Sequence, residues 1–183
     1  MWRLGQNYQR RICDGNVCYY GKRGFACCCR AGKLPYIDER RIYIWGESQG
    51  AFVAALAAAE IPDKIAGEIL LYPALNLADM GKQQFVKKSD VTDSVFMDIK
   101  LGSVYYQDIW DLDVYGNISC YSGPVLLLHG DQDELVPIAY SEKAKDVFKN
   151  VEYHVIHGQG HSFYNEAGRK ADRMILEFLK TVC

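Results

Sequence analysis

Apolar residues gather in short runs from about residue 41 onward, and stretches that suit a helix follow several of these runs. The runs predict strands at about 41–46, 66–72, 124–129 and 151–156, and the helices between and after them cover 49–60, about 138–149 and about 165–181. The run at 124–129 shows no polar alternation, which is typical of a parallel strand buried on both faces. Strands that alternate with helices predict an α/β fold, with a mostly parallel sheet flanked by helices.

Two regions depart from this alternation. Residues 1–33 show no clean helix or strand period and are rich in Gly, Arg and Cys. Residues 74–122 contain a charged stretch at 82–93 and then an aromatic-rich stretch. We therefore predict an irregular segment over 1–33. The rest of the chain has a length that suits one domain, so we predict a single domain over 34–183 that carries an insertion at about 74–122.

The pentapeptide Gly46–Gly50 (Gly-Glu-Ser-Gln-Gly) lies between the first predicted strand and the first predicted helix. Gly-x-Ser-x-Gly at such a turn is the pattern of a nucleophile elbow, which presents the serine hydroxyl at the top of a sheet. A chance match has odds of roughly one in fifteen, and the alternative is that Ser48 only caps the helix. The flanking strand and helix favour the elbow. We expect glycine at both ends of the motif because a side chain at either place would clash with the neighbouring strand or helix.

Two downstream loops supply the partners that a serine nucleophile needs. Asp133 follows the predicted strand at 124–129, and His161 follows the strand at 151–156. Together with Ser48 they come in the chain order Ser, Asp, His, which is the order of the α/β-hydrolase triad. Each lies just past the carboxyl end of a strand, where open α/β sheets bind their ligands.

Other residues compete for these two roles: Asp131 and Glu134 for the acid, and His129, His154 and His157 for the base. The triad pattern favours Asp133 over its acidic neighbours. His129 closes a buried strand and is expected to be a satisfied core histidine, whereas His161 lies in a glycine-rich loop. We therefore predict Asp133 as the acid and His161 as the base.

These residue types indicate acyl transfer. A serine hydroxyl is a weak nucleophile at neutral pH, so His161 would accept the proton of Ser48 and return it to the leaving group. Asp133 would hold the imidazole in one tautomer and stabilise the imidazolium. The backbone N–H of Gln49, directly after the nucleophile, would donate to the oxyanion.

The three motifs together resemble those of the α/β-hydrolase superfamily. They are Gly46–Gly50, the His-Gly-x-x-Asp-x-x-Val-Pro stretch at His129–Pro137 and the Gly-x-Gly-His pattern at Gly158–His161, and the resemblance covers about residues 38–183. Within the superfamily the chain is most similar to acyl esterases of the feruloyl/cinnamoyl esterase type. Oligopeptidase-like and acetyl xylan esterase-like branches share much of the pattern. Ala51 stands where close relatives more commonly have a third glycine.

The resemblance implies that the insertion at 74–122 is a lid over the nucleophile, and the alternative is a helical excursion that packs for stability alone. It also implies that Tyr105 and Gln84 contact a phenolic acyl group. Members of the superfamily carry several strands before the elbow and a loop with a second oxyanion donor, often a His-Gly motif. Since no histidine precedes His129, we expect an N-terminally truncated α/β-hydrolase fold, arising as a fragment, from a misassigned start, or as a divergent minimal hydrolase.

Composition and charge narrow the classes of function. The net charge is −2, with +6 over residues 1–41 and −8 over the remainder, and the basic residues form no nucleic-acid-binding motif. Five of the seven cysteines fall between Cys13 and Cys29, and neither their count nor their spacing indicates a disulfide framework or a zinc site. No membrane-length apolar run or secretion signal is visible. We expect no metal, cofactor, nucleic-acid partner or membrane partner, and a cytoplasmic location; a homodimer is left open.

The sequence thus predicts a serine hydrolase that cleaves carboxylic esters with short or aromatic acyl groups and acts on a small-molecule ester. Two alternatives stay open: a serine peptidase of the prolyl-oligopeptidase type, and an inactive truncated α/β-hydrolase-like domain.

Overall fold

The computed structural model of the chain describes residue 35 and residues 37–182. The predicted irregular segment 1–33 lies outside the described residues, so its boundary and its cysteine cluster stay predictions. The loop that would supply a second oxyanion donor was expected before the elbow, and the chain up to residue 34 lies outside the described residues as well.

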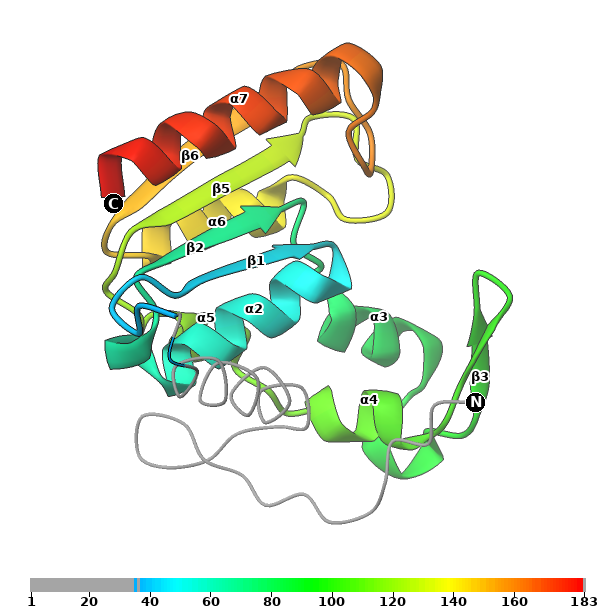
Figure 1. Ribbon diagram of the computed structural model, residues 1–183. Coiled ribbons are helices and arrows are strands. Elements are labelled where there is room, and N and C mark those ends of the chain that lie inside the picture. The colour runs from blue at the N-terminus through cyan, green and yellow to red at the C-terminus, as the bar shows by residue number, and fades with distance from the viewer. Residues whose placement is uncertain (1–34, 36, 183) are drawn as a thin grey trace.

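A four-stranded parallel sheet forms the centre of the molecule (Figure 1). Its strands lie in the order β1 (Tyr43–Glu47), β2 (Gly67–Leu71), β5 (Val125–Gly130) and β6 (Val151–Ile156). In register, Glu47 lies beside Leu71, and Leu71 lies beside Leu128. Because all four strands are parallel, their carboxyl ends meet at one edge of the sheet. The predicted mostly parallel sheet is confirmed.

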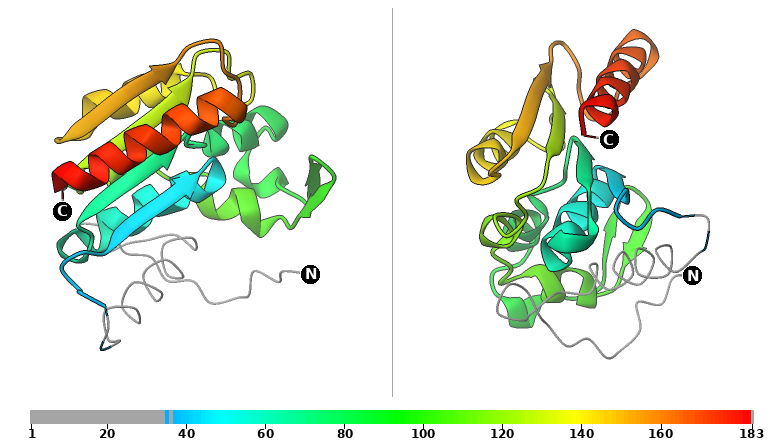
Figure 2. Two further views of the ribbon diagram at one scale, coloured as in Figure 1. Left: turned by 45° about the horizontal axis from the view of Figure 1, so that its top comes forward. Right: turned by 60° about the vertical axis from the view of Figure 1, so that its left-hand side comes forward.

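Helices cover both faces of this sheet (Figure 2). One face packs against α2 (Gln49–Glu60), α5 (Val114–Ile118) and α6 (Ala139–Val147), and the other packs against α7 (Asn165–Val182). The short 3-10 helix η1 (Pro62–Lys64) connects α2 to β2. Helix α6 ends before the predicted 149, because Phe148 takes an extended backbone conformation.

Alternate side chains of the two central strands enter two separate cores. Leu70 of β2 and Leu127 of β5 point to the side of α2, while Ile69 and Leu128 point to the side of α7. All residues of β2 and β5 are buried, which is why their sequences lack polar alternation. The two central strands, which carry the carboxyl edge of the sheet, are therefore packed on both faces.

The segment 74–122 leaves the sheet after β2 and returns at β5. It contains α3 (Leu77–Gln84), the 3-10 helix η2 (Lys88–Asp90), β3 (Ser94–Phe96), β4 (Ile99–Leu101), α4 (Val104–Ile109) and α5. Strands β3 and β4 pair as an antiparallel hairpin that projects away from the main sheet (Figure 1), an element that the sequence pattern did not predict. A Cβ at Gly81 of α3 would lie 2.7 Å from the ring of Tyr106, so this glycine lets α4 pack closely on α3. The role of the segment as a lid stays a prediction.

Cys120 lies two residues after α5. It is disulfide-bonded, although neither the count nor the spacing of the cysteines indicated a disulfide.

Candidate active site

Ser48 occupies the sharp turn between β1 and α2. Its backbone has φ 51° and ψ −120°, a conformation that is rare for a residue with a side chain and costs about 1–3 kcal/mol unless its surroundings impose it. The surroundings do so through the backbone, since the N–H of Ser48 donates to Leu71 O (3.0 Å) and its carbonyl accepts from Ala74 N (3.0 Å) and Phe52 N (3.2 Å). The serine is thereby fixed at the carboxyl edge of the sheet.

The two glycines of the elbow differ in the space available for a side chain. A Cβ at Gly46 would lie 2.3 Å from the backbone carbonyl carbon and oxygen of Gly50, so only glycine lets β1 and the first turn of α2 approach this closely. A Cβ at Gly50 would meet no heavy atom within 4 Å among the described residues. The expectation that a side chain would clash at both positions is therefore wrong for Gly50, which lies on an open face of the helix start.

The loop after β5 holds the carboxylate of Asp133 in a buried position. Its Oδ1 accepts hydrogen bonds from Leu135 N (2.9 Å) and Val136 N (2.8 Å), and its side chain is 0% exposed. The buried Asn76, in the loop between β2 and α3, donates from Nδ2 to Leu135 O (3.0 Å). This bond ties the Asp133 loop to the neighbouring loop of the sheet edge.

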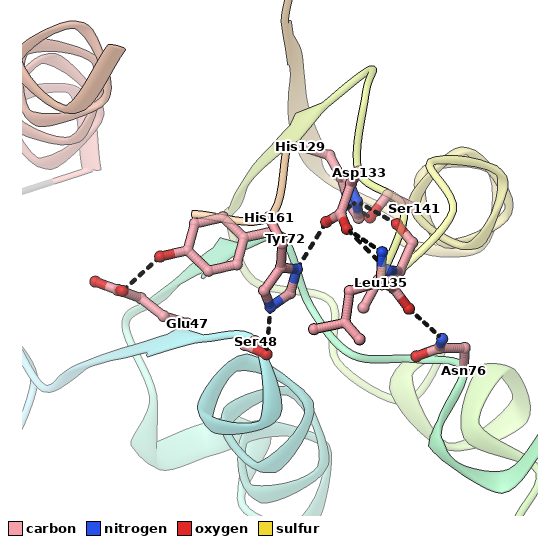
Figure 3. Close-up of polar contacts among 10 residues, drawn as sticks. Glu47, Ser48, Tyr72, Asn76, His129, Asp133, Leu135, Ser141 and His161 are labelled. Carbon is pink, nitrogen blue, oxygen red and sulfur yellow. Dashed lines mark hydrogen bonds and ion pairs between the residues drawn. The ribbon is translucent and has the colours of Figure 1, made fainter. Parts of the chain in front are cut away.

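His161 connects Asp133 to Ser48 (Figure 3). Its Nδ1 lies 2.8 Å from Asp133 Oδ2, and its Nε2 lies 2.7 Å from Ser48 Oγ. A carboxylate oxygen accepts hydrogen bonds, so Nδ1 carries the ring proton and Nε2 accepts the hydroxyl proton of Ser48. The structure thus brings the three predicted triad residues into one hydrogen-bonded chain, from segments up to 113 positions apart.

The competing acids and bases have other partners. Asp131 accepts from His157 Nδ1 (2.8 Å) and from Gly158 N (2.6 Å), so a competing acid and a competing base pair with each other. His154 Nε2 lies 2.6 Å from a carboxylate oxygen of Glu152 on the same strand. Glu134 is exposed to solvent.

The fourth histidine, His129, is fully buried, and both of its ring nitrogens have partners. It fits the description of a satisfied core histidine, but it also approaches the carboxylate of Asp133.

Tyr72 was missed by sequence reasoning, although it directly follows β2 beside the elbow. Its ring packs edge-on against His161 and against Phe163, each at 4.9 Å between centroids. Its hydroxyl donates to Glu47 Oε2 (2.5 Å), and burial together with this bond raises the pKa of Tyr72 well above its usual value. A Tyr-Pro pair directly after a buried strand at the sheet edge was the available signal, since that position faces the site.

The other predicted site residues are placed as follows. Gln49 is the first residue of α2, so its backbone N–H lies at the helix N-terminus beside Ser48. Gln84 ends α3 and is exposed, whereas Tyr105 of α4 is buried with its ring edge-on to Tyr106 at 5.0 Å. A substrate contact by Gln84 or Tyr105 stays a prediction.

The described residues form neither a metal-binding cluster nor a membrane-spanning helix. Over residues 37–182, no group of three or more His, Cys, Asp or Glu side chains could hold a metal ion. None of the helices described is both long enough and apolar enough to span a bilayer.

The chain matches known proteins in sequence and in fold. The sequence profile of the prolyl oligopeptidase family matches residues 15–183, while a sequence search of curated proteins gives no match. Est1E from Butyrivibrio proteoclasticus superposes with a TM-score of 0.78 at 26% identity, over 88% of this chain and 70% of Est1E. Est1E with ferulic acid bound gives 0.74 at 26% identity, over 86% of this chain and 67% of that chain.

A peptidase shares the fold at lower identity. Dipeptidyl peptidase 4 of Porphyromonas gingivalis superposes with a TM-score of 0.64 at 18% identity, over 90% of this chain and 23% of the peptidase. The parallel sheet, the elbow after β1 and the match over residues 15–183 agree with one another. The chain therefore belongs to the prolyl oligopeptidase family and is a serine hydrolase of the α/β-hydrolase type.

Proposed function

We propose that the chain hydrolyses carboxylic esters through an acyl-enzyme formed on Ser48. The observation that carries this proposal is the unbroken hydrogen-bonded chain from Ser48 Oγ through His161 to Asp133, with links of 2.7 and 2.8 Å. A nucleophile in hydrogen-bond reach of a base, and a base oriented by a third group, is the arrangement that activates a serine hydroxyl.

The proposed acylation moves one proton and exchanges one bond. Ser48 Oγ attacks the ester carbonyl carbon while His161 Nε2 accepts its proton, and Asp133 stabilises the imidazolium that forms. When the tetrahedral intermediate collapses, the bond to the leaving alcohol breaks and Nε2 returns the proton to the alcohol oxygen. Water then repeats the sequence on the acyl-enzyme, releasing the acid and restoring Ser48.

The negative charge of the tetrahedral intermediate requires donors next to the nucleophile. The backbone N–H of Gln49 follows Ser48 at the start of the twelve-residue helix α2. The positive end of a helix dipole and its N–H groups stabilise an anion at this place. We assign Gln49 N–H as one oxyanion donor on this basis.

An aromatic acyl group is the proposed substrate class. It is supported by the likeness to Est1E, which has been solved with ferulic acid bound, and by the aromatic-rich segment 74–122. That segment starts directly after Tyr72 and Pro73, beside the His161 ring. We propose this segment as a lid, with Gln84 and Tyr105 among its acyl contacts. The small-molecule ester partner and the cytoplasmic location stay proposals from the sequence.

Covalent labelling with a fluorophosphonate probe tests the nucleophile. The parent chain should be labelled, and Ser48→Ala should lose labelling and lower the turnover of ethyl ferulate by about 10⁴-fold or more. Ser122→Ala is the matched control, because Ser122 is exposed and lies before β5, at the opposite end of that strand from the site. Labelling that persists in Ser48→Ala would sink the assignment.

The family match favours a second candidate, a serine peptidase of the prolyl-oligopeptidase type. Assaying the parent chain with a prolyl amide beside ethyl ferulate separates the two, because hydrolysis of the amide alone would overturn the ester proposal. Absence of labelling in a folded parent chain would favour the inactive domain.

A further inference from the structure

A second imidazole reaches the acid of the proposed triad from its buried side. His129 is the second-last residue of β5, and its Nε2 lies 3.1 Å from Asp133 Oδ2. The side chains of both residues are 0% exposed. Asp133 thus lies between two imidazole rings, His161 toward the site and His129 toward the core (Figure 3).

The hydrogen bonds of His129 define its tautomer. Nε2 lies 2.9 Å from the carbonyl oxygen of Val136, which can only accept, so Nε2 carries the proton. Nδ1 lies 2.6 Å from Ser141 Oγ and accepts the hydroxyl proton of this fully buried serine of α6. Burial also lowers the pKa of His129, which agrees with a neutral ring. The N–H edge of the ring therefore faces both Val136 O and Asp133 Oδ2.

We propose that His129 is a positioning residue that acts through Asp133, with Ser141 holding its ring in the Nε2–H tautomer. This inference rests on the proposed function of Ser48, His161 and Asp133. Two backbone N–H groups hold Asp133 Oδ1, but Oδ2 receives only the two imidazole edges among the contacts described here. Without His129, Oδ2 would lose the N–H edge that lies 3.1 Å away on its core side, and the carboxylate would turn more freely.

His129 and Ser141 resemble a second Ser-His arm on the same acid, yet they cannot do the same chemistry. Both are 0% exposed, so no substrate reaches them, and the N–H edge of His129 already faces two acceptors, Val136 O and Asp133 Oδ2. The arm can only orient and support the carboxylate. A buried polar group that loses its hydrogen-bond partner is destabilising, which keeps the arm in place.

Two amide variants separate positioning from mere packing. The side-chain amide of His129→Gln reaches the place of Nε2 and can donate toward Asp133, whereas that of His129→Asn reaches the place of Nδ1 and contacts Ser141 alone. Both are neutral and polar, so their cost to folding should be similar. The readouts are the rate of fluorophosphonate labelling as a function of pH, and the urea midpoint as the measure of folding.

We expect His129→Asn to lower the plateau labelling rate by about tenfold to a hundredfold, the scale of a small misplacement in a catalytic group. Its acid limb should move to higher pH, since a carboxylate with fewer donors holds the proton on His161 more strongly. His129→Gln should recover most of the rate and of the profile.

Equal rates and equal profiles for the two amide variants would overturn the proposal, whatever their stabilities. Should neither variant fold, Ser141→Ala takes their place. It frees Nδ1 and is expected to shift the profile in the same direction by a smaller amount, and a parent-like profile would overturn the proposal. A parent chain without labelling would remove the proposed function and this inference with it. A labelled parent with indistinguishable variants removes this inference alone.

Discussion

Two Asp–His pairs join the same two loops at the same hydrogen-bond distance, yet they have different surroundings. The inner pair is Asp133–His161 and the outer pair is Asp131–His157, and in both the Nδ1···Oδ2 distance is 2.8 Å. Each pair links the loop after β5 to the loop after β6. The side chains of the inner pair are 0% and 18% exposed, whereas those of the outer pair are 34% and 81% exposed.

A short Asp–His distance therefore does not by itself make a catalytic pair. Only the inner ring continues to a serine hydroxyl, at 2.7 Å from Ser48 Oγ. Water and salt screen the outer pair, whereas burial strengthens the field that Asp133 exerts on its imidazole. For the proposed chemistry, two features distinguish the inner pair from the outer pair. They are the hydrogen bond to Ser48 and the exclusion of water.

The outer pair still has a structural role, because it links the two loops that carry the inner pair. Asp131 also accepts from Gly158 N, and Gln132 N donates to Gln159 O (2.9 Å) across the same gap. The hydrogen bond from His157 lowers the pKa of Asp131, so its ionised form is favoured in the folded state.

Replacing Asp133 and Asp131 by asparagine, one at a time, should give the largest difference in activity between the two pairs. Asp133→Asn keeps the shape but offers His161 an amide, and we expect about a 10⁴-fold loss in kcat, the scale of a triad acid neutralised in place. Asp131→Asn should stay within about threefold of the parent chain, as for other surface changes. Hydrolysis of ethyl ferulate measures both, and equal losses in the two variants would contradict the distinction between the pairs.

A methyl group at Gly130 should disturb both pairs at once. Its Cβ would lie 2.2 Å from the carbonyl oxygen of Gln159, so the loops after β5 and β6 must separate. We expect a loss of about 1–3 kcal/mol in the free energy of unfolding, as for overpacked sites, and a lower labelling rate at Ser48. Urea unfolding and probe labelling check the two effects.

Gly102→Ala is the control for this change, since its nearest neighbour would be Val104 Cγ1 at an ordinary 3.9 Å. If Gly130→Ala is as stable and as active as this control, the two loops are not packed as closely as the structure indicates.

The smallest expected effect is the pH dependence of the outer pair. Because the folded state lowers the pKa of Asp131, its stabilising contribution is fully present above the unfolded pKa of about 3.9. That contribution is lost as the pH falls through the folded pKa. The urea midpoints of the parent chain and Asp131→Asn should therefore differ slightly near neutral pH, less so at high salt, and converge in acid. A gap that is as wide in acid as at neutral pH would point to another cause.

Local patterns were sufficient to predict the central fold. The strand predicted at 151–156 and the helix predicted at 49–60 coincide with β6 and α2, because buried parallel strands and alanine-rich helices have distinct compositions. The β3–β4 hairpin was missed, since its strands have three residues each and are too short to show a period. Its turn residues Met97 and Asp98 have φ of 48° and 62°, where the usual signal would be Asn-Gly.

The candidate site likewise has residues that sequence motifs predicted and contacts that they did not. Ser48, Asp133 and His161 were named from motifs, whereas the packing of Tyr72 on His161 depends on how β2 ends beside the elbow. His129 was interpreted as a core residue, and the structure places it there with every ring nitrogen bonded. Its spacing of four residues before Asp133 was visible in the sequence, but only the turn of that loop brings the ring to the carboxylate.

Local sequence patterns predict the order of strands and helices along the chain. They also predict that a serine, two aspartates and two histidines fall at one edge of a parallel sheet. Which aspartate meets which histidine depends on how the loops pack in three dimensions. Asp133 and His161 are 28 residues apart, and their pairing depends on backbone donors and burial that arise when two loops close against each other. The elbow is a local pattern of backbone geometry, whereas the hydrogen-bonded chain through His161 exists only once three loops have packed together.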